Sequence, residues 1–119
     1  MEIDFRKKRY VLDGGMGTML QSAGMSPEET TTEFGLAHPE ILTEIHQKYM
    51  EAGSDIVYAS TFGTNRFKKK EMGDHSLEEA VRIQVEAAVT AKENMAAKGR
   101  EVAVALDLGP LGELLEPMG

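Results

Sequence analysis

An aspartate followed by a glycine-rich run, residues 13–17, is the stretch of this sequence best suited to chemistry. It comes directly after a short apolar run that predicts a strand over residues 9–13, and it leads into a predicted helix that ends near Gly24. Because glycine lacks a Cβ atom, the three glycines are free to adopt positive φ and to let a ligand come close to bare backbone amides. Parallel α/β folds bind ligands outside the carboxyl ends of their strands. Asp13 and the glycines therefore predict a binding site for a small polar molecule.

Two other interpretations of residues 13–17 follow from the local pattern. Glycines after a strand often form only a tight turn, and Asp13 could cap the following helix. A dinucleotide-binding fingerprint fits less well, because Leu20 occupies the position where a third glycine or alanine would allow close helix packing. The segment is therefore predicted to be either a binding loop or a plain turn.

The same arrangement follows two later apolar runs. Residues 55–59 predict a strand that ends in the polar loop 60–65, and residues 102–106 predict a strand that ends in an acidic, glycine-bearing loop, 107–110. Uninterrupted apolar runs of this kind are typical of parallel strands covered on both faces. In a parallel sheet these two loops lie on the same rim as Asp13.

Two helices are predicted to connect these strands. Pro39 at a first helical position, apolar residues at helical spacing and Gly53 as a stop signal predict the first helix. A capping box, Ser76-x-x-Glu79, begins the second helix, which ends near Gly99. We expect one face of this second helix to carry its main apolar residues, Leu77, Val81, Val85, Ala88 and Met95.

The predicted order of elements is strand, helix, strand, helix, strand. Residues 26–32 are expected to form a polar loop, and residues 109–112 and 116–119 are loop-like, with no further strand. This order predicts an α/β fold with a helix-covered parallel sheet. The pattern does not distinguish an open sheet from part of a closed barrel.

Composition and charge exclude several classes of partner. The 119 residues are 41% hydrophobic and 28% charged, as in a globular domain, and the net charge of −7 argues against nucleic-acid binding. The basic cluster of Arg66 and residues 68–70 is followed at once by Glu71 and is expected to be solvated surface. We expect no membrane partner and a cytoplasmic location, because the sequence has no bilayer-spanning apolar run and no signal-peptide pattern.

The chain contains no cysteine and three histidines. The absence of cysteine excludes disulfides and thiolate metal ligands within it. His38, His46 and His75 lie in different segments without metal-ligand spacing, and His46, on a predicted helix face, is expected to pack rather than to catalyse. The eight methionines are expected to fill the core. We therefore predict no metal site and no catalytic residue in these 119 residues.

Three ordered segments resemble the opening of the homocysteine S-methyltransferase family. They are Leu12-Asp13-Gly14-Gly15-Met16-Gly17-Thr18-Met19-Leu20-Gln21, the stretch from His38-Pro39-Glu40 to Ala52-Gly53-Ser54-Asp55-Ile56-Val57, and Ser60-Thr61-Phe62-Gly63. The tail from Val104 to Leu114 is most similar to the homocysteine-binding domain of cobalamin-dependent methionine synthases. The resemblance extends from about residue 9 to residue 119.

The resemblance implies a (β/α)₈ TIM-type barrel, of which this chain would form the first three βα units, parallel strands with covering helices. Such barrels need about 250 residues, so residues 1–119 are expected to be the N-terminal part of an incomplete homocysteine-binding domain. The remaining half of the barrel and the cobalamin and folate domains would be its partners. Self-association as a homo-oligomer is a further hypothesis, because it would cover unpaired strand edges.

The resemblance also implies where homocysteine would bind. Asp13 would accept hydrogen bonds from the substrate ammonium group, and the backbone amides of Gly14, Thr61 and Phe62 would hold the substrate carboxylate. Ser60 departs from the family, which commonly has asparagine at this position.

The implied zinc chemistry depends on residues that this chain lacks. Family members hold zinc with three cysteines from later strands, and the zinc lowers the pKa of the homocysteine thiol. Methylcobalamin is the expected methyl donor, but members that use betaine or S-methylmethionine share the opening motif. The intact protein is expected to be a zinc-dependent methyltransferase of the methionine synthase type that makes methionine, and this chain alone is expected to be inactive. The alternative is a free-standing partial barrel that binds or assembles without catalysis.

Overall fold

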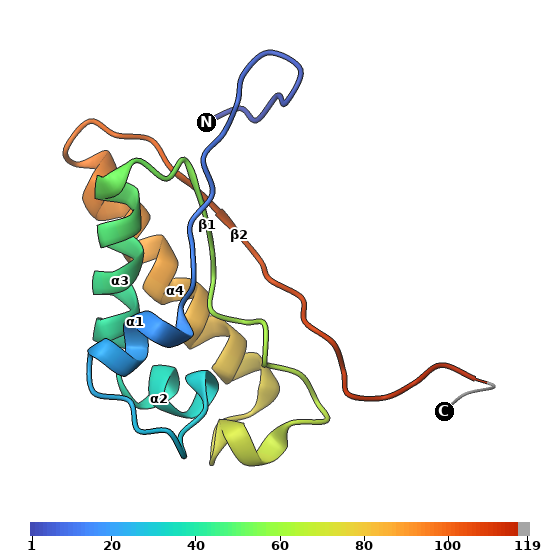
Figure 1. Ribbon diagram of the computed structural model, residues 1–119. Helices are drawn as coiled ribbons and strands as arrows, with labels where there is room; N and C mark the ends of the chain where they lie inside the picture. The colour runs from blue at the N-terminus through green and yellow to red at the C-terminus, as the bar shows by residue number, and fades with distance from the viewer. Residues whose placement is uncertain (117–119) are drawn as a thin grey trace.

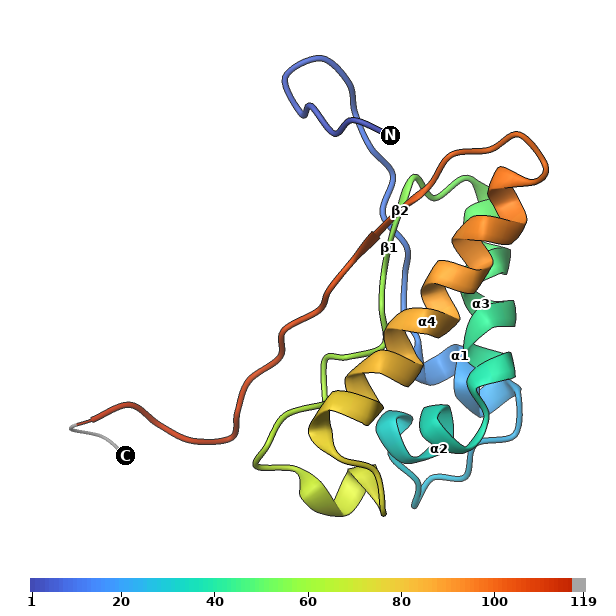
Figure 2. The ribbon, with the colours of Figure 1, turned by 180° about the vertical axis from the view of Figure 1, so that it is seen from behind.

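Two long helices cover one face of a short sheet in the computed structural model, which describes residues 1–116 (Figure 1). They are α3, Pro39–Ala52, and α4, Leu77–Ala96. The sheet consists of β1, Ile56–Tyr58, and β2, Ala103–Ala105, which pair in parallel. The view from behind shows the same two layers, with α3 and α4 together on one side of the strands (Figure 2). The predicted α/β class and the parallel pairing of these two strands are confirmed.

Local signals account for the ends of both long helices. Pro39 opens α3, His38 before it makes no side-chain capping bond, and Gly53 ends the helix at φ 120°, a conformation that favours glycine. Ser76 begins α4 by accepting a hydrogen bond on its Oγ from the Glu79 amide at 3.1 Å. Both helices are confirmed where the sequence predicts them.

Small side chains on α4 allow it to approach α3 closely. Ala87 packs with Leu42 in one apolar cluster, and Ala91 packs with Met50 in another. The Thr43 hydroxyl of α3 donates a hydrogen bond to the Ala87 carbonyl at 3.0 Å, a distance that bulky side chains at this contact would prevent. The core therefore lies between the two helices and beneath the sheet.

The predicted apolar face of α4 is only partly right. Ala88 and Met95 are buried, whereas Leu77, Val81 and Val85 are half-buried. The alanines, and not the valines, turn toward α3, because close packing of two helices favours small residues at the contact. Val85 instead lines a hollow with Val104 of β2, and Val81 lines one with residues 64–67.

The predicted first strand, residues 9–13, is reduced to a single parallel bridge between Leu12 and Ile56. Carboxylates interrupt the ladder on both sides of this bridge. The Asp55 carboxylate accepts the amide of the residue before Leu12 at 2.9 Å, and the Asp13 carboxylate accepts the amide of the last β1 residue at 3.2 Å. Side chains thus take amides that a longer ladder would pair with carbonyls. The prediction of three complete βα units stays a prediction.

The predicted polar loop over residues 26–32 is wrong at its end, where α2, Thr31–Ala37, begins. The Thr30 hydroxyl caps this helix by accepting the Glu33 amide at 3.1 Å. Threonine followed three residues later by glutamate is a capping-box spacing, so the sequence carries a signal for this helix. Phe34 and its neighbours bury the apolar face of α2.

Two short helices complete the described elements. α1, Gly17–Ser22, begins at the last glycine of the run, and a helix after this run is predicted from the sequence. η1, a 3₁₀ helix at Lys69–Met72, carries part of the basic cluster. Lys69 and Lys70 are exposed, which agrees with the predicted solvated surface, and Met72 is buried, as expected for core methionines.

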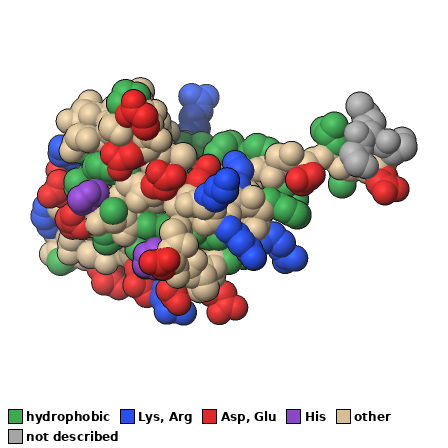
Figure 3. Space-filling model, turned by 90° about the horizontal axis from the view of Figure 1, so that it is seen from below, with side chains coloured by type: hydrophobic (Ala, Val, Ile, Leu, Met, Phe, Trp, Pro, Cys, Tyr) green, Lys and Arg blue, Asp and Glu red, His purple; other side chains and the backbone are tan. Residues whose placement is uncertain are grey.

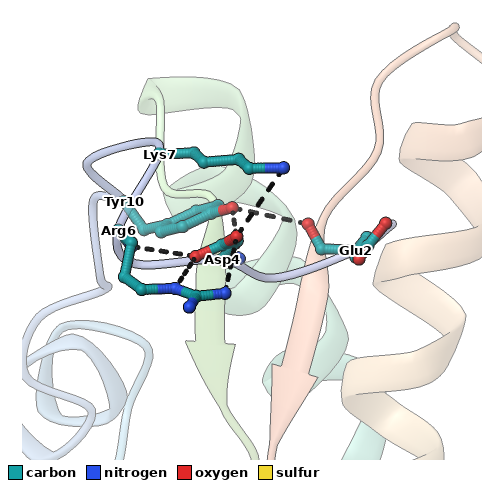
Figure 4. Close-up of polar contacts among 5 residues, drawn as sticks. All are labelled: Glu2, Asp4, Arg6, Lys7 and Tyr10. Carbon is teal, nitrogen blue, oxygen red and sulfur yellow. Dashed lines mark hydrogen bonds and ion pairs between the residues drawn. The ribbon is translucent and has the colours of Figure 1, made fainter.

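The N-terminal arm folds back on itself at the amino ends of the strands (Figure 4). Asp4 lies at its centre: its carboxylate accepts the Arg6 amide at 3.0 Å and lies 3.9 Å from Lys7 Nζ. The Asp4 amide donates to the Tyr10 hydroxyl at 3.0 Å, and that hydroxyl donates to the Glu2 carbonyl at 3.4 Å. The arm therefore lies at the end of the sheet opposite the predicted site.

The chain after β2 leaves the body as an extended segment with hydrophobic side chains along it (Figure 3). Five of its leucines are exposed, Leu106, Leu108, Leu111, Leu114 and Leu115. The end of the predicted loop-like tail, residues 117–119, lies outside the described residues. Among residues 1–116, no helix is long and apolar enough to cross a membrane.

Candidate functional site

The predicted polar loops meet at the carboxyl ends of the strands, around a cavity of about 270 Å³. The first loop contributes Asp13 and Gly14, the loop after β1 contributes Ser60 and Phe62, and the loop after β2 contributes Asp107. Three segments that are far apart in the sequence therefore converge on one hollow. Its size suits a small polar ligand such as a single amino acid.

Asp13 is one of two acidic residues that line this cavity, the other being Asp107. The Asp13 carboxylate accepts the Tyr58 amide at 3.2 Å, and within residues 1–116 it has no ion-pair partner. Burial raises the pKa of Asp13, backbone hydrogen bonds lower it, and the nearby charge of Asp107 raises it further. A cation placed between the two carboxylates would relieve this repulsion. The position favours an ammonium group.

Asp13 does not cap the following helix, so the alternative interpretation of Asp13 as a cap is wrong. The N-cap position of α1 is Met16, and no side chain makes a capping bond there. The carboxylate instead reaches across to β1, because the bridge at Leu12 holds the two segments side by side. The local sequence cannot tell a helix cap from this contact with β1, since the partner amide lies 45 residues away.

Gly14, Gly15 and Gly17 are free to adopt positive φ but do not adopt it. What Gly14 provides is space: a Cβ atom at this position would lie 3.1 Å from the Tyr49 hydroxyl oxygen. That hydroxyl donates a hydrogen bond to the Gly15 carbonyl at 2.6 Å. The glycine run therefore allows a side chain from α3 to approach the loop backbone.

Thr61 joins the loops after β1 and β2 through its side chain. Its buried hydroxyl donates to the Asp107 carbonyl at 2.8 Å and accepts the Asp107 amide at 3.1 Å. Its own amide donates to the Ala59 carbonyl at 2.7 Å, so this predicted donor is engaged within its loop. Close by, a Cβ atom at Gly109 would collide with the Phe62 carbonyl, so the two loops need glycine there. Phe62 itself is 55% exposed at the cavity.

Three residues of this site are not among the predicted site residues. The sequence marks Asp107 as an acid at a strand end without assigning it to the site, and it indicates only a strand position for Tyr58 and a helix position for Tyr49. Their contacts join segments more than 30 residues apart. Helical or strand periodicity contains no signal for such contacts.

The histidines and acids offer no metal centre in the described part of the chain. His46 is fully buried in α3, and burial lowers its pKa to about 4, in agreement with the predicted packing role. Within residues 1–116 no three His, Cys, Asp or Glu side chains are grouped so that they could hold a metal ion. The zinc ion that the resemblance implies is therefore not matched by ligands in these residues.

A family model described as Homocysteine S-methyltransferase matches residues 10–119. The chain belongs to this family. The methionine synthase of Mycobacterium leprae (strain TN) is 34% identical over 76 residues, which are 59% of this chain and 6% of that protein. The methionine synthase of Mycobacterium tuberculosis (strain ATCC 25618 / H37Rv) is 34% identical over 87 residues, 67% of this chain and 7% of that protein. The chain thus spans less than a tenth of the length of these curated relatives.

Solved structures give the same family fold. The homocysteine methyltransferase MmuM of Escherichia coli in its oxidised form matches with a TM-score of 0.79 at 24% identity, over 91% of this chain and 40% of that one. Its metallated form matches with a TM-score of 0.72 at 23% identity, over 90% and 40%. At this level of identity the likeness concerns the fold alone: the chain has part of the barrel fold of these enzymes.

Proposed function

We propose that this chain is the N-terminal part of a zinc-dependent homocysteine S-methyltransferase of the methionine synthase type, and that it supplies part of the rim that binds homocysteine. Family membership supports the reaction class, methyl transfer to the homocysteine thiol to make methionine. The observation that carries the proposal is the cavity at the strand ends, where Asp13 faces a small hollow without a cationic partner in residues 1–116.

The proposed binding mode follows from the groups around the cavity. The substrate ammonium binds the Asp13 carboxylate, whose charge is poorly balanced beside Asp107. The amides of Gly14 and Phe62 hold the substrate carboxylate, since neither amide has an acceptor within residues 1–116. Thr61 contributes chiefly by positioning, because its amide already donates to the Ala59 carbonyl.

Activation of the thiol is assigned to residues outside this chain. The 119 residues contain no cysteine, so they do not fit a three-cysteine zinc site. The proposed partners are the remaining half of the barrel and the cobalamin and folate domains, with methylcobalamin as methyl donor, in the cytoplasm. The purified 119-residue chain would then bind homocysteine without methyl transfer.

A second function, a free-standing partial barrel that assembles without catalysis, is favoured by two observations. The segment after β2 exposes five leucines, and β2 has a free edge in the described residues. The intact mass of the protein in its source cells separates the two proposals. A species several times heavier than 13.0 kDa supports the methyltransferase, and a species of 13.0 kDa supports the assembly module.

A titration of the ¹⁵N-labelled chain tests the binding mode. L-homocysteine should shift the Gly14 and Phe62 amide signals, and 4-mercaptobutanoic acid, which lacks the amino group, should bind about ten-fold more weakly, as expected for the loss of a charged hydrogen bond. Asp13→Asn should remove this preference, whereas Asp4→Asn, at the opposite end of the sheet, should retain it. Equal affinity of the two compounds for the unmodified chain would refute the binding mode.

A further inference from the structure

We infer that Tyr49 is the positioning residue of this site: from α3, it fixes the loop of Asp13, Gly14 and Gly15 so that the Asp13 carboxylate faces the cavity. The inference rests on the proposed homocysteine site and adds a residue whose role is to place the loop. Its basis is the juxtaposition of the Tyr49 side chain with two consecutive glycines of the binding loop.

The contact is short and specific. The Tyr49 hydroxyl donates to the Gly15 carbonyl at 2.6 Å, across 34 residues of sequence. The same ring lies against the Gly14 backbone, because a Cβ atom at Gly14 would be 3.1 Å from the hydroxyl oxygen and 3.3 Å from the nearest ring carbon. The tyrosine therefore determines both the distance between the loop backbone and α3 and the direction of the Gly15 carbonyl.

Tyr49 is itself held firmly, which a positioning residue requires. Its ring packs against both main apolar clusters, one built around Leu42 and the other around Met50. Its backbone carbonyl accepts the Ser54 amide at 3.0 Å, in the turn that ends α3. The Ser54 hydroxyl in turn donates to the Leu12 carbonyl at 3.2 Å, just before the loop. The loop is thus tied to the end of α3 at two points.

The rest of the loop is tied mainly through its acid. Asp13 accepts the Tyr58 amide, which fixes one end of the loop to β1. At the other end, the Met16 carbonyl accepts the Leu20 amide and begins α1. Between these ends, the bond from Tyr49 is the tether of the two glycines within residues 1–116. Without the Tyr49 hydrogen bond, the Asp13 carboxylate would be followed by a longer segment of backbone that nothing holds in place.

Tyr49→Phe tests the role of the hydroxyl, because the ring and its packing stay in place. We expect the backbone amide signals of residues 14–17 to shift in the ligand-free chain and the dissociation constant for L-homocysteine to rise about five-fold, as for one hydrogen bond. Tyr10→Phe is the matched control. It removes a tyrosine hydroxyl at the opposite end of the sheet and should change neither quantity.

A second variant tests the same contact from the loop. Gly14→Ala places a methyl group 3.1 Å from the Tyr49 hydroxyl and should weaken L-homocysteine binding. In the double variant with Tyr49→Phe the hydroxyl is gone, so we expect the combined loss to be smaller than the product of the two separate losses. Independent, multiplicative effects would argue against a direct contact between these positions.

The outcomes separate this inference from the proposed function. Shifted signals at residues 14–17 together with weaker binding in Tyr49→Phe support the positioning role. Unchanged amide signals in Tyr49→Phe overturn the positioning role. An unchanged dissociation constant for L-homocysteine in Tyr49→Phe also overturns it, if Asp13→Asn in the same assay loses binding. If the unmodified chain fails to bind L-homocysteine although Tyr49→Phe moves the signals of residues 14–17, the proposed function falls and the placement of the loop by Tyr49 stands.

Discussion

The layer of α3 and α4 and the rim at the strand ends are held together in different ways. In the helix layer, Leu42, Met50 and the facing alanines are buried in contiguous apolar clusters. At the rim, Thr61 makes two side-chain hydrogen bonds to the Asp107 backbone, and Tyr49 makes one to the Gly15 carbonyl. Burial supplies most of the folding energy and depends little on direction, whereas hydrogen bonds are modest in net energy and directional.

The difference indicates that the helix layer mainly stabilises the fold and that the rim mainly shapes the binding site. Substitutions in the helix layer should change stability and leave ligand preference alone. Substitutions at the rim should cost less stability and change binding. Variants in each region test whether stability and binding are separate in this way.

The largest loss of stability is expected for Leu42→Ala. Leu42 is fully buried between α3 and α4, and its truncation removes apolar contacts and leaves a cavity. We expect the free energy of unfolding to fall by about 3 kcal/mol. Urea unfolding followed by circular dichroism measures it. A loss below about 1 kcal/mol would mean that the helix layer is not the main source of stability.

The next largest expected effect is a loss of stability at acidic pH that is caused by His46. Its side chain is fully buried, neither ring nitrogen has a partner within residues 1–116, and burial lowers its pKa to about 4 from 6.5. Between these two values the unfolded chain binds a proton that the folded chain does not. The free energy of unfolding therefore contains the full contribution of the neutral His46 above pH 6.5. This contribution is lost as the pH falls toward 4, by roughly 3 kcal/mol in total.

Unfolding experiments at a series of pH values check this expectation, with His46→Leu as the comparison. The carboxylates titrate in both proteins, so the difference between the two profiles isolates the histidine. The difference should grow steadily from pH 6.5 to about pH 4. Parallel profiles would mean that His46 has the same pKa in the folded and the unfolded chain, and that the helix layer is more open than the structure describes.

A smaller effect on stability is expected for Thr61→Val at the rim. The substitution keeps the shape but removes both hydrogen bonds to the Asp107 backbone. We expect a loss of about 1–2 kcal/mol and weaker L-homocysteine binding. Thr43→Val makes the same change in the helix layer, where the hydroxyl bonds to the Ala87 carbonyl. It should leave binding unchanged, and weaker binding in Thr43→Val would break the separation of the two regions.

The helix layer is largely predictable from the sequence because its signals are local. Pro39, Gly53 and the capping box at Ser76 lie within a few residues of the ends that they determine. The spacing of Thr30 and Glu33 is a signal of the same kind, so the start of α2 is also encoded locally, although the polar composition around it favours a loop. The face of α4 is harder to predict, because the alanines that turn toward α3 can be recognised only once the partner helix is known.

The rim is predictable only in part. An acid and glycines at a strand end indicate a site, and Asp13 and Gly14 do border the cavity with Phe62. The contacts that shape it join distant segments: Tyr49 to Gly15, and Thr61 to Asp107. For the same reason the sequence overestimates the first strand, since the two carboxylates that interrupt its ladder take amides more than 40 residues away.

The pKa of Asp13, measured with and without L-homocysteine, tests the proposed site most directly. Selective ¹³C labelling of aspartate follows the carboxyl carbon during a pH titration. In the free chain, burial and Asp107 hold this pKa above its usual value. A bound ammonium group favours the charged carboxylate, so saturating L-homocysteine should lower the pKa. A pKa that stays the same at saturation would mean that the ammonium group binds elsewhere, and the proposed role of Asp13 would be wrong.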